Sequence, residues 1–229
     1  MPAVLSTNNL TVPDDFPASQ YDAVHTKLVA HGSKNEHRLF MGALHGISYR
    51  FKALADYDDS FTASINAHGT TSGQPIRYQQ ERDLFGFFSN AFSVFDSFCF
   101  ALFAIGSLAS PANFPLATPE DERNVNWGSL QRAYCRAFPA NPILNALTTI
   151  TTDTAFAELR DIRNILTHRA APGRRYEIEV SSSVTLTGTT ISRLNIPLDA
   201  ATTSSRRRHV AKLLHPGFDA TQKFVEDHL

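Results

Sequence analysis

The sequence predicts a mainly α-helical protein with a small β-hairpin flap before its C-terminal helix. Apolar residues recur at helical spacing through most of the chain, and phenylalanine is abundant, with 17 residues. Strict alternation of apolar and polar residues occurs only between residues 174 and 198. A chain of 229 residues can bury one good core, and no linker-like stretch divides it. We therefore expect a single domain over residues 1–229.

The N-terminal part of the chain divides into an arm and the start of a helical bundle. We expect residues 1–18 to form an extended arm on the surface, because they contain three prolines and show no periodicity. The bundle is expected over residues 19–170. Its pattern predicts a first helix that ends at Gly32, a longer helix from Glu36 to Tyr57, and a loop from Gly69 to Pro75.

The next segment, Tyr78 to Leu108, carries apolar residues on nearly every face. A helix of this kind is typical of the centre of a bundle. Asn90 and Asp96 interrupt it, and its charge-free apolar part is shorter than the ~20 residues that a bilayer span needs. We therefore expect a buried helix and no association with a membrane.

The second half of the chain is expected to add shorter elements. Two short helices, over 127–138 and 142–150, precede an amphipathic helix from Thr154 to Arg169 that Thr152 or Asp153 caps. Alternation then predicts the β flap over 174–198. The chain is expected to return to helix over 199–229, with a break at Pro216 and Gly217.

Composition excludes several classes of function. The formal net charge of -1 gives no global attraction to nucleic acid or anionic membranes, so a polyanion site has to be a local patch. P-loop, dinucleotide-binding and α/β-hydrolase motifs are missing. The first residues lack the pattern of a secretory signal, which makes a cytoplasmic location the expectation.

Metal and cysteine chemistry are not expected either. The histidines are not accompanied by a cluster of cysteines or carboxylates, so we expect no metal site and no other cofactor. Cys99 and Cys135 lie in apolar helical sequence, far apart. We expect both to be buried thiols.

Arginine is locally concentrated on the 154–169 helix and just after it. The polar face of this helix displays Arg160, Arg163, Asn164 and His168. From Glu158 to Arg175 the sequence holds two acidic residues and five arginines, which are Arg160, Arg163, Arg169, Arg174 and Arg175. A solvated helix face more often alternates lysine with glutamate, so this composition predicts a local basic patch that binds a polyanion.

The string R-N-x-x-x-H at Arg163, Asn164 and His168 resembles the R-x-x-x-x-H signature of the HEPN superfamily. Members of this superfamily are four-helix-bundle proteins, and many are metal-independent ribonucleases. As in the family, the motif lies near the end of a late bundle helix and carries an asparagine after the arginine. A long preceding helix also contains an acidic residue, Asp96, in apolar sequence. The resemblance covers about residues 36 to 170.

The resemblance implies an endoribonuclease that cleaves RNA by attack of the ribose 2′-OH. The residue types fit this chemistry, because histidine titrates near neutral pH and the planar fork of arginine pairs with phosphate oxygens. His168 would be the general acid and base, Arg163 the phosphate clamp, and Asn164 would orient one of them. Asp96 and Arg160 would support the site. Arg169, Arg174 and Arg175 would bind RNA.

A second copy of the chain belongs to the same hypothesis. Positions five apart on one helix are separated by about 140° around its axis, so Arg163 and His168 do not share a stripe. In the HEPN superfamily two motifs line one cleft across a dimer interface, which implies a homodimer here. The resemblance also implies RNA as substrate, a regulatory or antitoxin protein as a further partner, and a setting in defence or stress response.

Other interpretations of these residues remain open. His168 could interact only with the helix dipole, and Arg160 could form surface ion pairs. Asp96 either pairs with an arginine of the motif helix or stays hydrated at the end of the bundle. The run from Arg206 to His209 is either a solvated helix start or an extension of a phosphate-binding surface. The competing function is a non-catalytic module that binds a nucleotide, RNA or a partner protein.

Overall fold

The computed structural model describes residues 3–5, 9–31, 34–168, 172–181, 183–191 and 194–229, without the side chains of residues 34–37. In these residues the protein is mainly α-helical with a small β-hairpin before its last helix, which confirms the predicted fold class. The helices are α1 (Ala18–His31), α2 (Lys34–His68), α3 (Gln74–Ala109), α4 (Pro119–Arg123), α5 (Trp127–Ala137), α6 (Ile143–Thr152), α7 (Thr154–His168) and α8 (Ala201–His228). The strands are β1 (Ala3–Val4), β2 (Thr11–Val12), β3 (Arg174–Val180), β4 (Val184–Ile191) and β5 (Ile196–Pro197).

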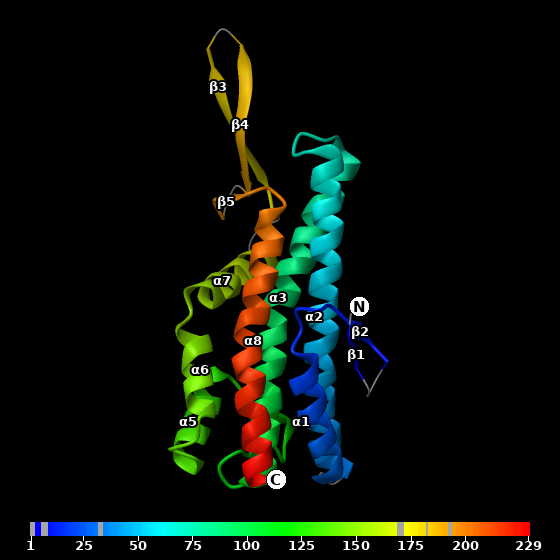
Figure 1. Ribbon diagram of the computed structural model, residues 1–229. Coiled ribbons are helices and arrows are strands. Elements are labelled where there is room, and N and C mark those ends of the chain that lie inside the picture. Colours follow the sequence, from blue (N-terminus) through cyan, green and yellow to red (C-terminus); the bar gives the residue numbers. More distant parts are fainter. Residues whose placement is uncertain (1–2, 6–8, 32–33, 169–171, 182, 192–193) are drawn as a thin grey trace.

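The long helices α2, α3 and α8 run side by side along the length of the molecule (Figure 1). The first helix, α1, packs on α8 and α2, and α5, α6 and α7 lie on the other flank. Because α3 contacts α2, α5, α7 and α8, it is the centre of the bundle, as its apolar sequence predicts. Its buried aromatic side chains are Phe87, Phe88, Phe92, Phe95, Phe98 and Phe103.

By length and composition, α3 is the one helix in the described part of the chain that could cross a membrane. In the folded protein 67% of its most apolar window is buried against other elements. The apolar side chains of this window are therefore used by the core of the bundle.

The second helix extends further than its sequence predicts. It runs to His68 instead of ending near Tyr57, because its last turns pack against the start of α3. Ser60 Oγ donates a hydrogen bond to Asp83 Oδ2 at 2.6 Å, and Gln80 Nε2 donates one to Ser64 Oγ at 3.1 Å. These polar residues interrupt the apolar periodicity in the sequence, but their partners lie across the helix pair, where a local pattern cannot show them.

The prediction of a break at Pro216 and Gly217 is wrong, since α8 continues through both residues. Proline removes one backbone hydrogen bond, and burial of this part of α8 compensates for the loss. Phe218 and Phe224 are fully buried. Gly217 lets α8 approach α3 closely, because a Cβ at this position would lie 2.9 Å from the ring of Phe98.

The N-terminal arm is packed into the protein. Strands β1 and β2 pair in antiparallel fashion, and Leu5, Val12 and Phe16 are buried. The ring of Phe16 contacts that of Phe51 on α2 at 5.2 Å between centroids, and that of Phe218 on α8 at 6.2 Å. The arm therefore contributes to the core, which corrects the expectation that it lies on the surface, because three of its apolar side chains reach between the helices.

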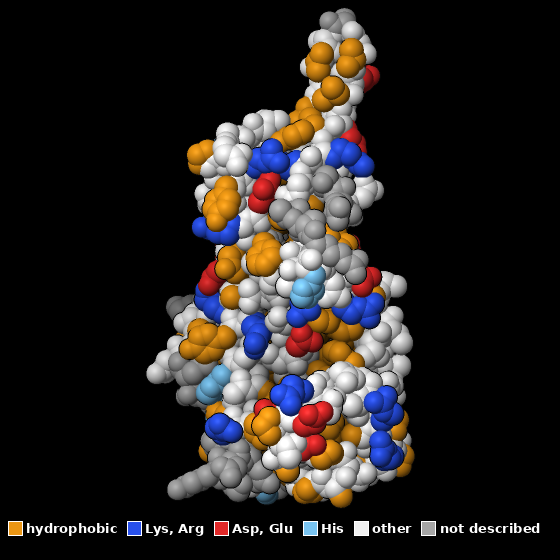
Figure 2. Space-filling model, turned by 180° about the vertical axis from the view of Figure 1, so that it is seen from behind, with side chains coloured by type: hydrophobic (Ala, Val, Ile, Leu, Met, Phe, Trp, Pro, Cys, Tyr) orange, Lys and Arg blue, Asp and Glu red, His pale blue; other side chains and the backbone are white. Residues whose placement is uncertain are grey.

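The β flap projects from one end of the bundle (Figure 1). Strand β3 pairs with β4, and β4 pairs with β5, all in antiparallel fashion. Val180 lies opposite Val184, and Ile178 lies opposite Leu186. The apolar side chains of the hairpin are 40 to 71% exposed: Tyr176, Ile178, Val180, Val184 and Leu186. Hydrophobic side chains are visible along this projection in Figure 2.

Candidate functional site

The motif helix α7 is fixed against α3 by its apolar face. Phe156 packs on Phe92 and Phe95 of α3, with centroid distances of 5.6 and 5.2 Å. Leu159, Ile162 and Leu166 are buried on the same face. This packing leaves the polar face of α7 accessible and fixes the direction of the side chains on it.

The start of α7 is capped by Asp153, one of the two predicted capping residues. Asp153 Oδ1 accepts a hydrogen bond from the backbone N–H of Phe156 at 2.9 Å and lies 2.9 Å from His209 Nε2 on α8. Desolvation opposes ionisation of this carboxyl group. The hydrogen bonds from Phe156 and His209 outweigh that effect and hold the pKa of Asp153 below its usual value.

We expect Asp153→Ala to lower the free energy of unfolding at pH 7 by about 1–2 kcal/mol, because it removes a helix cap. A depressed folded-state pKa stabilises the protein above the ordinary carboxyl value of about 4, and this stabilisation is lost as the pH falls through the folded-state value. The difference from wild type should therefore shrink below about pH 4 in urea titrations. Asp161→Ala, an exposed change on the same helix, is the control, and a similar loss in both variants would contradict the capping role.

Arg163 lies on the side of α7 that faces α3. Its guanidinium lies over the ring of Phe92, 5.5 Å from the centroid, and Nη1 donates a hydrogen bond to Asn164 Oδ1 at 3.1 Å. Arg163 Nη2 is 4.0 Å from Asp96 Oδ2. The side chain is 31% exposed. Because an arginine carries five N–H donors, this one is held in place and still has donors for a ligand.

Asp96 lies beside Arg163, in agreement with the interpretation that pairs it with the motif helix. Its side chain is 48% exposed. Desolvation raises the pKa of Asp96, and the guanidiniums of Arg163 and Arg50 act in the opposite direction. Charges of arginines on two helices, α7 and α2, thus act on this carboxylate.

His168 is the last residue of α7 and is exposed. It has no hydrogen-bond or ion-pair partner among the residues that the structure describes, and no contact with Arg163. Asn164 bonds to Arg163 and not to this histidine. The structure therefore brings Arg163, Asn164 and Asp96 together, and leaves His168 apart within one chain.

Arg160 lies outside this cluster. It is exposed and pairs with its neighbour Asp161 at 3.3 Å, an arrangement that contributes little to stability. In the described part of the chain, Arg160 makes no hydrogen bond or ion pair with Arg163, Asn164 or Asp96 that would support the site. This geometry agrees with the alternative of a surface ion pair.

Arg174 is buried, with 1% of its side chain exposed. Its guanidinium joins the base of the hairpin to the turn before α3 and to the first turns of α3. The partners are Thr70 O at 2.6 Å, Gln80 Oε1 at 2.8 Å, Arg77 O at 3.3 Å and Glu81 Oε1 at 3.4 Å. The expectation that Arg174 binds RNA is therefore corrected: its donors hold the flap to the bundle.

The two other arginines expected to bind RNA have different outcomes. Arg175 is 52% exposed, donates to Asn195 Oδ1 and lies 3.6 Å from Glu177 Oε1. It remains accessible to a ligand. Arg169 lies outside the described residues.

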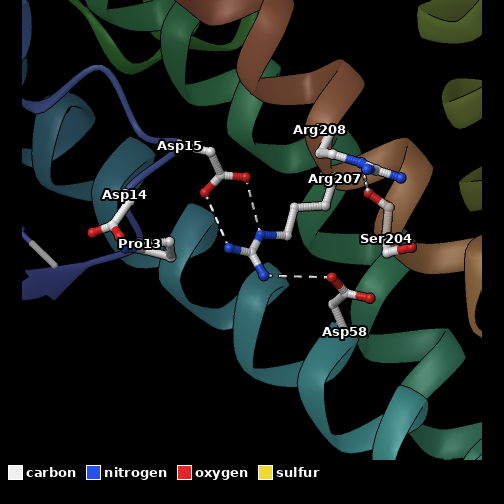
Figure 3. A pocket seen from close by; sticks show the side chains of 7 residues that line it. All are labelled: Pro13, Asp14, Asp15, Asp58, Ser204, Arg207 and Arg208. Carbon is white, nitrogen blue, oxygen red and sulfur yellow. Dashed lines mark hydrogen bonds and ion pairs between the residues drawn. The ribbon is translucent and has the colours of Figure 1, made fainter. Parts of the chain in front are cut away.

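The basic run at the start of α8 is used mainly within the protein. Arg207 donates to Asp15 Oδ2 at 3.2 Å and to Asp15 Oδ1 at 3.1 Å, and it reaches Asp58 Oδ2 at 3.4 Å (Figure 3). Arg206 pairs with Glu158 Oε1 at 2.8 Å. These contacts tie the N-terminal arm, α2 and α7 to α8. They agree neither with a solvated helix start nor with a phosphate-binding surface at these two residues.

A groove of about 500 Å³ lies between α2 and α3 on the Asp96 side, with Glu122 of α4 also on its wall, and no sequence pattern indicated it. Arg38, Arg50 and Phe100 line it together with Asp96 and Ser97. Arg50 lies in an otherwise apolar helical pattern, which gives no signal that its side chain crosses to α3. Only the packing of the two helices places it there.

Histidines and cysteines form no metal-binding cluster in the described residues, where no group of three His, Cys, Asp or Glu side chains could hold an ion. Cys99 is buried, and burial raises the pKa of its thiol to about 12. Cys135 is exposed, so the expectation that both thiols are buried is wrong for this residue. The face of its helix that contacts the bundle carries Leu130, Ala133 and Tyr134 instead.

Comparisons of the chain with protein-family models, with curated proteins and with solved structures found no match. The function is therefore argued from the arrangement of Arg163, Asn164, Asp96 and His168.

Proposed function

We propose that the protein is a HEPN-like, metal-independent endoribonuclease whose site is formed by two copies of the chain. The observation that carries the proposal is the state of Arg163. It is fixed by Phe92, Asn164 and Asp96, yet it is 31% exposed and keeps unused donors. A positioned guanidinium of this kind stabilises a phosphate in which negative charge develops.

His168 supplies the proton transfers in this proposal. It removes the proton of the ribose 2′-OH, the 2′ oxygen attacks phosphorus, and the 5′ oxygen of the next nucleotide leaves with a proton. The products are a 2′,3′-cyclic phosphate and a 5′-hydroxyl. Exposure at the end of α7 leaves the imidazole accessible to a substrate.

A second copy of the chain could bring His168 and Arg163 together in one site. His168 makes no contact with Arg163 of its own chain in the described residues, so we propose that it completes the site around Arg163 of a partner. The hairpin begins six residues after His168, and its apolar residues are exposed. Exposed apolar side chains of this kind are stabilised when a second surface covers them, which favours contact between copies at this end of the molecule.

The competing function is a non-catalytic module that holds RNA or a nucleotide at Arg163. The lack of contact between Arg163 and His168 favours it, since a binding site needs the guanidinium alone. In this alternative a ligand raises the melting temperature of the protein and RNA stays intact.

Incubation with a mixed RNA pool in EDTA distinguishes these functions. We expect wild type to cut the RNA and leave cyclic phosphate ends, and an Arg163→Ala, His168→Ala double variant to leave it intact. EDTA inactivates contaminating metal-dependent nucleases, so they do not contribute to the cleavage that is measured. Intact RNA with wild type, or equal cutting by both proteins, would contradict the ribonuclease proposal.

A further inference from the structure

Arg50 is held by a feature that the Arg163 motif does not explain. It lies on α2, and its Nη1 donates a hydrogen bond to Ser97 Oγ on α3 at 2.5 Å. The residue one turn earlier is Gly46. A Cβ at Gly46 would lie 2.4 Å from Arg50 Nη1 and 3.1 Å from Ser97 Oγ. The absence of a side chain at Gly46 therefore makes the space in which the guanidinium crosses to α3.

This position brings Arg50 close to the proposed active site. Ser97 follows Asp96 directly, and Arg50, Asp96 and Ser97 line the same groove. Asp96 is also 4.0 Å from Arg163 Nη2. Guanidiniums from two helices thus lie near one carboxylate: Arg163 pairs with it, Arg50 is held by Ser97, and both arginines keep unused donors.

Arginines of this protein differ in what their donors do. Arg174 and Arg207 each bond to several acceptors of other elements. Arg50 donates a single hydrogen bond, to Ser97, in the part of the chain that the structure describes. Its side chain lines a groove of about 500 Å³ together with Arg38 and Phe100, and the carboxylates of Asp96 and Glu122 lie on the same wall. A groove with cationic and aromatic groups suits single-stranded nucleic acid, whose phosphates pair with arginine while bases stack on rings.

We propose that Arg50 is a second phosphate-binding residue, and that the groove between α2 and α3 takes a phosphate next to the one at Arg163 on the same single-stranded RNA. This inference rests on the proposed function. It adds Arg50 as a residue that positions the strand, with Phe100 as a surface for a base and Gly46 as the residue that makes room for the guanidinium.

Gly46→Ala tests the placement of Arg50 without changing charge. The added methyl group displaces a flexible guanidinium end, and Arg50→Gln removes the charge itself. The probe is a 2′-O-methyl oligonucleotide of about ten nucleotides, which cannot be cleaved and whose binding is followed by fluorescence anisotropy. For both variants we expect about tenfold weaker binding, and a slope of log affinity against log salt that falls by about 0.7.

Matched controls separate this effect from a general one. Gly73→Ala adds a methyl group where nothing lies within 4 Å, and Lys223→Gln removes one exposed charge on α8. Both should bind like wild type. Thermal unfolding of each variant shows whether it is folded, and Arg50→Gln avoids the steric change near Ser97.

The outcomes keep the two proposals apart. Wild type that binds and cuts RNA, with Gly46→Ala and Arg50→Gln binding as tightly and with the same salt slope, would overturn the role of Arg50 alone. Wild type that neither binds the oligonucleotide nor cuts RNA would overturn the proposed function and this inference together. Weaker binding with a lower slope in both variants, but in neither control, supports the second phosphate site.

Discussion

Arg174→Ala is expected to lower the free energy of unfolding by about 3 kcal/mol, the range found when one partner of a buried charge pair is removed. The side chain is 1% exposed and joins β3 to the turn before α3 and to the first turns of α3. Without it, the Gln80 amide oxygen and the Thr70 carbonyl lose a donor in a place that water does not reach freely. Denaturant titration followed by circular dichroism measures the loss.

The adjacent arginine provides the control. Arg175 is 52% exposed, and its contacts with Asn195 and Glu177 lie at the surface, so Arg175→Ala should change the free energy of unfolding by less than about 0.5 kcal/mol. Equal effects of the two changes would show that Arg174 does not hold the flap to the bundle.

The difference in burial between Arg174 and Arg175 could be predicted from the sequence only in part. Alternation along β3 places neighbouring residues on opposite faces, so the sequence could predict that they differ. It could not say which one is buried, because the acceptors of Arg174 come from residues 70 to 81, about a hundred positions earlier. A basic patch counted from sequence therefore included an arginine that the fold uses internally.

The sequence pattern predicted some helices well and others only in part. The sequence pattern was sufficient for α3 and α7, because α3 is apolar on nearly every face and α7 carries an apolar stripe that packs on the core. It was insufficient at the end of α2 and at Pro216, where contacts between distant helices decide the structure. In the candidate site, the motif gave Arg163, Asn164 and His168. Packing of α2 on α3 was needed to find Arg50.

Loss of RNA cleavage is the second large effect that we expect. His168→Ala and Arg163→Ala should each reduce the cleavage rate by about a hundredfold or more, since one removes the general acid and base and the other the charge that stabilises the transition state. His168 is exposed, and the side chain of Arg163 is 31% exposed. Circular dichroism and thermal unfolding should therefore stay close to wild type.

Mixing these two inactive variants tests the central claim, a site shared between two copies. In a dimer of one Arg163→Ala chain and one His168→Ala chain, the intact Arg163 and the intact His168 lie on different chains. One of the two shared sites then holds both side chains. After unfolding and refolding together in equal amounts, random pairing should restore about a quarter of the wild-type rate. No recovery, with heterodimers present by mass spectrometry, would contradict a site built from Arg163 of one copy and His168 of the other.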